Sequence, residues 1–273
     1  MSRRSGGPPV SDLTDSTLFK VLDGLSPMHG GVGRYPSVGR WTTRHLNPQQ
    51  LKPCVYGYHL TRGPQVLGWL GPTLYVAEAC PDHPPVDDGH KLVTCRVRLV
   101  RRFDRWNDVT ARLFAADCAE AALLGERASG REPDERAWAA VDAARRYARG
   151  EIQFAALSAA WEAAWDAAAA ARVAARDTAV AATAAADWDA ARSTAVAAAA
   201  AAARAARATA AAAAKGAAGN AAEAAAEAAA WDTAEAAAWD AKVALYRRLC
   251  AYLEGAPIPP VEPLYGVKEG ADA

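Results

Sequence analysis

Three side chains in the first third of this 273-residue chain belong to the types that nucleotide-using transferases employ, namely His29, His59 and Glu78. An imidazole can carry a proton near neutral pH, and a glutamate can handle a ribose hydroxyl or the charge of an oxocarbenium ion. His59 and Glu78 also lie beside runs that contain tyrosine. The three residues are candidates for a catalytic site because of their chemistry alone, since no spacing rule joins them. A structural role for each stays open.

A basic cluster follows these residues. Arg96 and Arg98 alternate with apolar residues and therefore share one face of a predicted strand. Arg101 and Arg102 continue the cluster. Such a cluster can contact phosphate or nucleic acid, with Trp106 as a stacking partner. The alternative is a solvated strand face whose charges bind no ligand.

Cysteines and histidines occur in a pattern that approaches a zinc site. Cys80-Pro-Asp-His83 precedes His90 and Cys95, and two cysteines with two histidines can bind zinc tetrahedrally. Cys95, however, lies on the apolar face of a predicted strand, and residues 80–90 are rich in turn-forming proline and aspartate. We therefore expect a solvated loop beside a buried cysteine, with no bound metal and no other cofactor.

The remaining motifs point to no known catalytic machinery. The five cysteines are an odd number without a CxxC pair, which fits reduced thiols and a cytoplasmic location better than a disulfide framework. Residues 29–33 are rich in glycine but lack the ending that places a lysine on phosphates, so they predict a turn. GxSxG, HExxH and catalytic-cysteine signatures do not occur.

Composition narrows the function classes further. The 31 basic and 31 acidic residues balance, so nothing global points to nucleic acid or to an acidic ligand. The N-terminal residues carry positive charge without an apolar stretch, so we expect no secretory signal. The most apolar window, residues 195–214, is largely alanine and contains Arg204 and Arg207, so we expect no membrane span.

Residues 17–106 are expected to form a β-rich head domain after a flexible leader at residues 1–16. Four short apolar runs, rich in β-branched and aromatic residues and separated by glycine and proline, predict its strands. A single helical turn is expected at residues 65–70. The four runs are residues 18–22, 54–58, 73–77 and 92–100.

Connecting helices are predicted at residues 107–150. Asp108 can cap a helix that reaches Glu126. A second helix is predicted from Pro133, a residue favoured in the first turn, to Arg149. Both helices are expected to lead into the region that follows.

Alanine dominates that region, residues 151–255. Between Glu151 and Asp240, 51 of 90 residues are alanine, which has the highest helix propensity. The glycines of this stretch are Gly216 and Gly219, with basic residues before them and acidic residues after them. This pattern predicts an antiparallel helical hairpin. The alternative is that a GC-rich genome inflates alanine codons and that the charge placement is drift.

Tryptophans are spaced through the alanine-rich region, and those four or eight residues apart roughly share a helix face. We expect them to anchor helix packing, while an exposed aromatic stripe for a partner is the alternative. A last amphipathic helix has its apolar stripe over residues 245–253, and the proline-rich residues 256–273 predict a mobile tail. The tryptophans are Trp161, Trp165, Trp188, Trp231 and Trp239.

Five short stretches carry a resemblance to a known family. They are Phe19-Lys20-Val21-Leu22, His29-Gly30-Gly31, Gly57-Tyr58-His59-Leu60, Leu74-Tyr75-Val76-Ala77-Glu78 and the strand from Arg96 to Arg102. Through them, residues 17–105 resemble a domain of unknown function found in phage and actinobacterial proteins, where it often precedes alanine-rich sequence. The resemblance covers about a third of the chain and implies a mobile-element or actinobacterial setting, but no catalytic residues.

Together these patterns predict an α+β chain with a small β-rich head and long alanine-rich helices. The leading hypothesis is a non-enzymatic interaction protein, in which the head recognises a ligand and the helices act as a spacer or oligomerise. A protein partner or self-association is expected, without a membrane. Two alternatives stay open: a nucleotide-dependent transferase with its site in the head, and nucleic-acid binding through residues 96–105.

Overall fold

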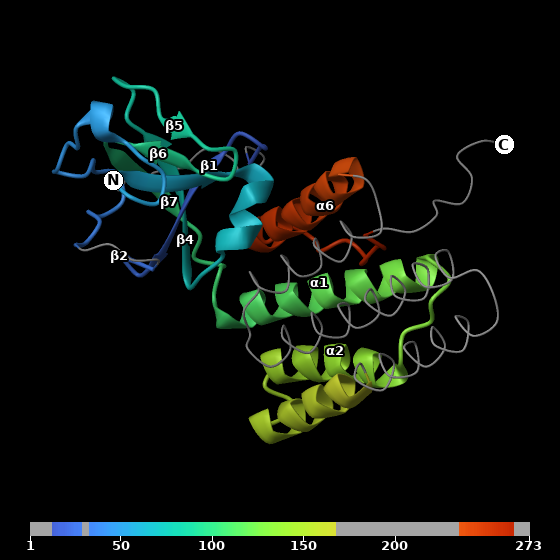
Figure 1. The fold of residues 1–273 in the computed structure, drawn as a ribbon. Coiled ribbons are helices and arrows are strands. Elements are labelled where there is room, and N and C mark those ends of the chain that lie inside the picture. Colours follow the sequence, from blue (N-terminus) through green and yellow to red (C-terminus); the bar gives the residue numbers. More distant parts are fainter. Residues whose placement is uncertain (1–12, 29–32, 168–234, 265–273) are drawn as a thin grey trace. The chain divides into compact units, whose positions relative to one another are not determined.

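The computed structural model describes residues 13–28, 33–167 and 235–264. The chain divides into two compact units (Figure 1). The first unit, the head, comprises residues 1–107 together with residues 246–258, and the second comprises residues 108–245 and 259–273. The head therefore includes a C-terminal segment that the sequence pattern assigns to the alanine-rich region and the tail.

The head contains a seven-stranded antiparallel sheet, and helices dominate the described part of the second unit, so the fold is mixed α+β as expected. The strands follow the order β5-β6-β3-β1-β4-β7, and β2 pairs with β1. The strands are β1 (Leu18–Asp23), β2 (Ser26–Pro27), β3 (Tyr58–Arg62), β4 (Thr73–Ala79), β5 (Val86–Asp87), β6 (Leu92–Thr94) and β7 (Val97–Arg102).

Alternation along the strands separates the two faces of the sheet. One face carries a buried apolar cluster that includes Leu22, Leu60 and Leu99. The other face carries Phe19, whose ring stacks on Phe103 at a centroid distance of 6.2 Å. Because side chains on a strand alternate between faces, the central strand β1 contributes to both layers. Burial of these residues is the main stabilising contribution to the head.

The strand predicted at residues 54–58 is wrong in its bounds, because β3 begins only at Tyr58. Cys54 has a left-handed backbone, with a φ of 62°, and Gly57 has a φ of 136°. Neither conformation belongs to a strand, so this segment turns before the ladder starts. The predicted strand at residues 92–100 is likewise divided into β6 and β7, with Cys95 between them.

The helical turn predicted at residues 65–70 is present as a 3₁₀ helix, η3 (Gly63–Trp69). A second short 3₁₀ helix, η2 (Pro48–Gln50), is capped by the side chain of Asn47, which accepts a hydrogen bond from the Gln49 amide. The apolar stripe predicted at residues 245–253 lies on helix α6 (Glu235–Glu254). Tyr246, Leu249 and Leu253 are buried there.

Two helices of the second unit lie side by side, α1 (Asp108–Ala128) and α2 (Glu135–Ala148), as Figure 1 shows. The Asp134 side chain caps α2 by accepting from the Arg136 amide, so the helix starts slightly later than Pro133. Arg145 donates to the Asp117 carboxylate at 2.6 Å and also to that of Glu120. Alanines are prominent among the buried residues of both helices.

Residues 154–167 are helical, and the rings of Trp161 and Trp165 lie 5.9 Å apart, as their spacing predicts. The proposed hairpin at Gly216–Gly219 lies outside the described residues, as do Trp188 and Trp231. Among the helices that the structure describes, none has the length and apolar character needed to cross a membrane.

Candidate functional site

Glu78 and Arg98 face each other across strands β4 and β7. The register pairs the two residues directly, and the Arg98 Nε donates to Glu78 Oε2 at 2.8 Å. A second nitrogen of the same guanidinium contacts the same oxygen. The Glu78 carboxylate, a candidate catalytic group in the sequence, is therefore held by an arginine. Both side chains stay partly exposed on the sheet surface.

Trp41 completes this surface. The guanidinium of Arg98 lies 5.1 Å from the centre of the indole ring, and that of Arg96 lies 5.5 Å from it. The segment at residues 39–46 holds the ring in place by running beside β7, where the Thr42 amide donates to the Val97 carbonyl at 2.9 Å. Guanidinium and indole planes at this distance attract each other through the ring quadrupole.

The other two arginines of the predicted cluster continue along the same strand. Arg101 lies over the ring of Phe103 at 4.6 Å, and Arg102 lies 3.4 Å from the exposed carboxylate of Asp104. Trp106, the predicted stacking partner, is instead a core residue whose Nε1 donates to the Gly71 carbonyl at 2.7 Å. We call Trp41, Arg96 and Arg98 the Arg–Trp surface.

The balanced charge of the whole chain conceals a division along its length. Residues 1–107 contain 14 basic and 8 acidic residues, a net charge of +6, while residues 108–273 contain 17 basic and 23 acidic residues, a net charge of −6. A charge asymmetry of this size between segments is a sign of an anionic partner for the basic one. The Arg–Trp surface belongs to the basic segment.

The three candidate catalytic residues do not form one described constellation. His59 lies on β3 and Glu78 on β4, and β1 runs between these strands. The Nε2 atom of His59 accepts a hydrogen bond from the Cys54 amide at 2.9 Å. Burial, and then the positive charges of Lys20 and Lys91, lower the pKa of His59, so this nitrogen remains an acceptor near neutral pH. His29 lies outside the described residues.

A second basic corner surrounds Cys54, and no motif in the sequence predicts it. Lys91 Nζ lies 2.8 Å from the exposed Cys54 thiol and 5.0 Å from the centre of the Trp69 ring. Lys20, partly buried on β1, donates to the carbonyl of His59 at 2.8 Å. Only the Asp87-Asp88-Gly89 turn, which precedes Lys91, is a sequence signal for this arrangement.

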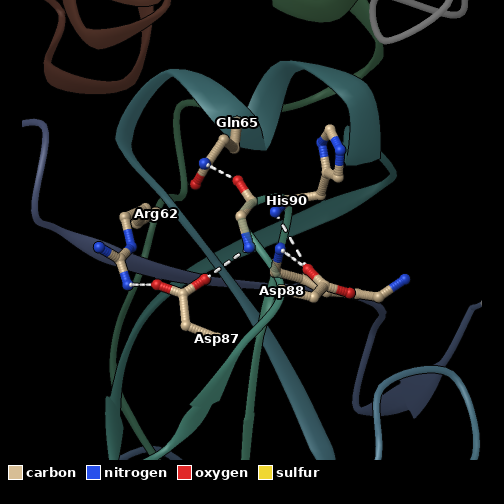
Figure 2. Close-up of polar contacts among 7 residues, drawn as sticks. Arg62, Gln65, Asp87, Asp88 and His90 are labelled. Atoms are coloured by element: carbon tan, nitrogen blue, oxygen red, sulfur yellow. Dashed lines mark hydrogen bonds and ion pairs between the residues drawn. The ribbon is translucent and has the colours of Figure 1, made fainter.

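That turn is fixed by polar contacts, which Figure 2 shows. Arg62 pairs with Asp87, whose other oxygen accepts from the Gly89 amide at 2.9 Å. The Asp88 carboxylate accepts from the amides of His90 and Lys91, which lowers the pKa of Asp88. The turn therefore holds Lys91 toward Cys54. It also keeps His90 exposed and places it among these turn contacts.

Metal-ligating side chains gather at a different place in the head. Ligand atoms of His45, Cys80 and Cys95 all lie within 4.8 Å of one another. Cys80 and Cys95 are buried, and His45 is exposed. Burial, together with the hydrogen bond to Cys80, raises the pKa of the Cys95 thiol. His45 was not among the metal candidates in the sequence, because 35 residues separate it from Cys80 and no motif joins them.

Comparisons with protein-family models, curated proteins and solved structures find no match for this chain.

Proposed function

We propose that this chain is a non-enzymatic interaction protein whose head binds single-stranded nucleic acid through the Arg–Trp surface. The observation that carries this proposal is the stacking of two guanidinium groups on Trp41, 5.1 and 5.5 Å from the ring centre, within a segment of net charge +6. Guanidinium groups bind phosphate, and an indole face accepts a stacked base.

The geometry suits a single strand better than a duplex. Arg96 and Arg98 lie against the Trp41 ring, so phosphate contacts and a stacking plane lie close together, and Arg98 would share its guanidinium between Glu78 and the phosphate. Single-strand binding proteins use this combination of charge and aromatic surface, and it tolerates many sequences because every base has a π face. Arg101 and Arg102 add positive charge further along β7, although neighbouring strand residues point to opposite faces of the sheet.

A nucleotide-dependent transferase remains the alternative, with His29, His59 and Glu78 as its candidates. The contacts of His59 and Glu78 favour the transferase less than the nucleic-acid proposal. Arg98 already neutralises the Glu78 carboxylate, and the lone pair of His59 Nε2 is occupied by a backbone amide. Either residue would have to exchange its partner before it could act on a substrate.

In this proposal the alanine-rich helices act as a spacer or self-association region, with the hairpin at Gly216–Gly219 as their turn. Small side chains allow helices to approach closely, which suits a bundle. The resemblance of residues 17–105 to the phage and actinobacterial domain stays a prediction, as does the cytoplasmic location. Sedimentation of the purified chain tests self-association, because a stable oligomer would support the spacer role.

The nucleic-acid proposal is tested by fluorescence anisotropy with labelled single-stranded DNA and RNA oligonucleotides over a series of salt concentrations. We expect the Arg96→Ala/Arg98→Ala double variant to bind more weakly and to lower the slope of log K against log salt by about 0.7 for each lost phosphate contact. Trp41→Ala should cost about 1–3 kcal/mol per stacked base.

The matched control is the Arg34→Ala/Arg44→Ala double variant, which removes the same charge from two exposed positions of the head. It should retain most of the affinity, and circular dichroism should show that every variant is folded. Equal losses in the two double variants would indicate non-specific charge attraction, and no binding by the unmodified chain would reject the proposal.

A further inference from the structure

Two buried cysteines lie at one end of the sheet, where three chain segments meet. Cys80 follows β4 directly, and Cys95 lies in the short connection between β6 and β7. The Cys80 amide donates to the Arg96 carbonyl and to the Thr94 side-chain Oγ1, both at 3.1 Å, so the residues on either side of Cys95 hold Cys80 in place.

The third segment brings His45. The Leu46 amide donates to the Cys95 carbonyl at 3.0 Å, which places the preceding residue, His45, beside the two thiols. The Tyr58 hydroxyl donates to the Arg44 carbonyl at 3.2 Å and supports the same segment from β3. Apolar side chains surround the cysteines on the inner side, including Leu46, which is buried with them.

We propose that His45, Cys80 and Cys95, completed by His83, form a zinc site. This inference is independent of nucleic-acid binding. Thiolate and imidazole are the ligands that structural zinc sites use, and a tetrahedral zinc places its ligand atoms roughly 3.3–3.8 Å apart. The three ligand atoms already lie within 4.8 Å of one another, so small side-chain rotations bring them to that spacing.

His83 supplies the fourth ligand because its ring is already beside that of His45. The two ring centroids are 5.9 Å apart, whereas two imidazoles on one tetrahedral zinc have centroids roughly 5 Å apart, as Zn–N distances near 2.0–2.1 Å imply. Asp82, whose Oδ2 atom lies 3.9 Å from the Cys80 sulfur, is on the same loop. The site would join the loop after β4, the connection before β7 and the segment that carries Trp41.

The set of ligands differs from the one that the sequence suggests. His90 belongs to the turn fixed by Asp87 and Asp88, where its amide donates to Asp88 Oδ1 at 3.0 Å. His45 replaces it, although it lies 50 residues before Cys95. Two buried cysteines can also be ordinary small core residues. That role would not require the exposed imidazole of His45 to lie beside both sulfur atoms.

The test uses the full chain, purified without oxygen and without chelator. Elemental analysis should find one zinc per chain, and titration of the metal-free protein with Co²⁺ should give the absorption bands of a tetrahedral site with thiolate ligands. His45→Ala should weaken Co²⁺ binding by at least about 10–100-fold, since even partners outside the coordination sphere have effects of that size. His83→Ala should weaken it as well.

Two control variants separate this site from unspecific binding. His90→Ala removes the histidine of the sequence pattern, and Cys54→Ser removes an exposed thiol, and both should bind Co²⁺ as the unmodified chain does. His45, Cys54 and His90 are all exposed, so substitutions at these positions avoid the unfolding that a change at the buried Cys95 risks.

Three results would overturn the proposal. The first is an absence of thiolate bands at stoichiometric Co²⁺, and the second is an equal loss of affinity in His45→Ala and His90→Ala. The third is a count of three free thiols instead of five, with a disulfide between Cys80 and Cys95 in the protein purified without oxygen. Unchanged affinity in His83→Ala would overturn the assignment of the fourth ligand.

Discussion

Lys20 is the residue of the head whose position is least expected from its chemistry. It lies on the central strand β1, with its ammonium 5.0 Å from the centre of the Tyr35 ring, and it donates to the His59 carbonyl. No carboxylate takes part in these contacts. Burial lowers the pKa of Lys20 to about 8, because the charged form loses its hydration. The neutral His59 carbonyl and the Tyr35 ring compensate for only part of the lost hydration of the ammonium group.

Lys20→Met should therefore stabilise the head near pH 7, by at most about 3 kcal/mol, since one pKa unit corresponds to ~1.4 kcal/mol. Below pH ~8 Lys20 is protonated in both states and the full cost of burying its charge is present. Between about 8 and 10.5 the unfolded chain binds the proton and the folded chain does not, so the stability of the unmodified protein rises with pH. Urea unfolding of both proteins across this range measures the difference, which should shrink as pH rises. A constant difference, or a less stable variant at pH 7, would contradict this account.

Arg98, Trp41 and His45 show what a sequence can and cannot predict about a site. Alternation placed Arg96 and Arg98 on one strand face correctly, because a period of two depends only on neighbouring residues. The prediction of Trp106 as the aromatic partner was wrong. Trp106 and Trp41 look alike in sequence, and only the pairing of residues 39–46 with β7 brings Trp41 beside the arginines, while Trp106 is buried. His45 gave no signal for the same reason.

At the scale of elements, the packing of α1 against α2 depends on a buried ionic contact. Asp117 is almost fully buried on α1, and Arg145 of α2 donates to it at 2.6 Å. A capping aspartate and a first-turn proline predicted the two helices but not this contact, because the two residues are 28 positions apart. Helices with local sequence signals near their starts, such as Asp108 and Pro133, were predictable, whereas the residues that join the helices were not.

Arg145→Ala should destabilise the helical unit by about 1–3 kcal/mol, because it removes a charged hydrogen-bond donor from the buried Asp117 carboxylate. The neighbouring Arg146 provides a matched control. It pairs with Asp142 at 3.8 Å on the exposed face of α2, so Arg146→Ala should cost no more than about 1 kcal/mol. Chemical denaturation followed by circular dichroism compares the two variants. Similar losses in both would mean that the Arg145 contact adds nothing beyond a surface ion pair.

At the scale of the molecule, the head is completed by a segment more than a hundred residues away in sequence. Residues 246–258 belong to the same compact unit as residues 1–107. The ring of Tyr246 meets that of Phe19 edge-on at 6.1 Å, and its hydroxyl donates to the Thr14 carbonyl at 2.9 Å. A domain boundary drawn from the change in composition at residue 107 therefore misses part of the head, because composition records neighbours in sequence and not contacts in space.

A fragment of residues 1–107 should accordingly lack a cooperative thermal transition. Tyr246, Leu249 and Leu253 are buried, and their burial contributes on the order of 5 kcal/mol, which is comparable to the net stability of a small domain. Adding a peptide of residues 239–258 should restore the transition, while a peptide with Tyr246→Ala and Leu249→Ala should not. Calorimetry of the fragment with each peptide provides the measurement. If the fragment alone unfolds cooperatively at the temperature of the full chain, the C-terminal segment is dispensable and the head ends at residue 107.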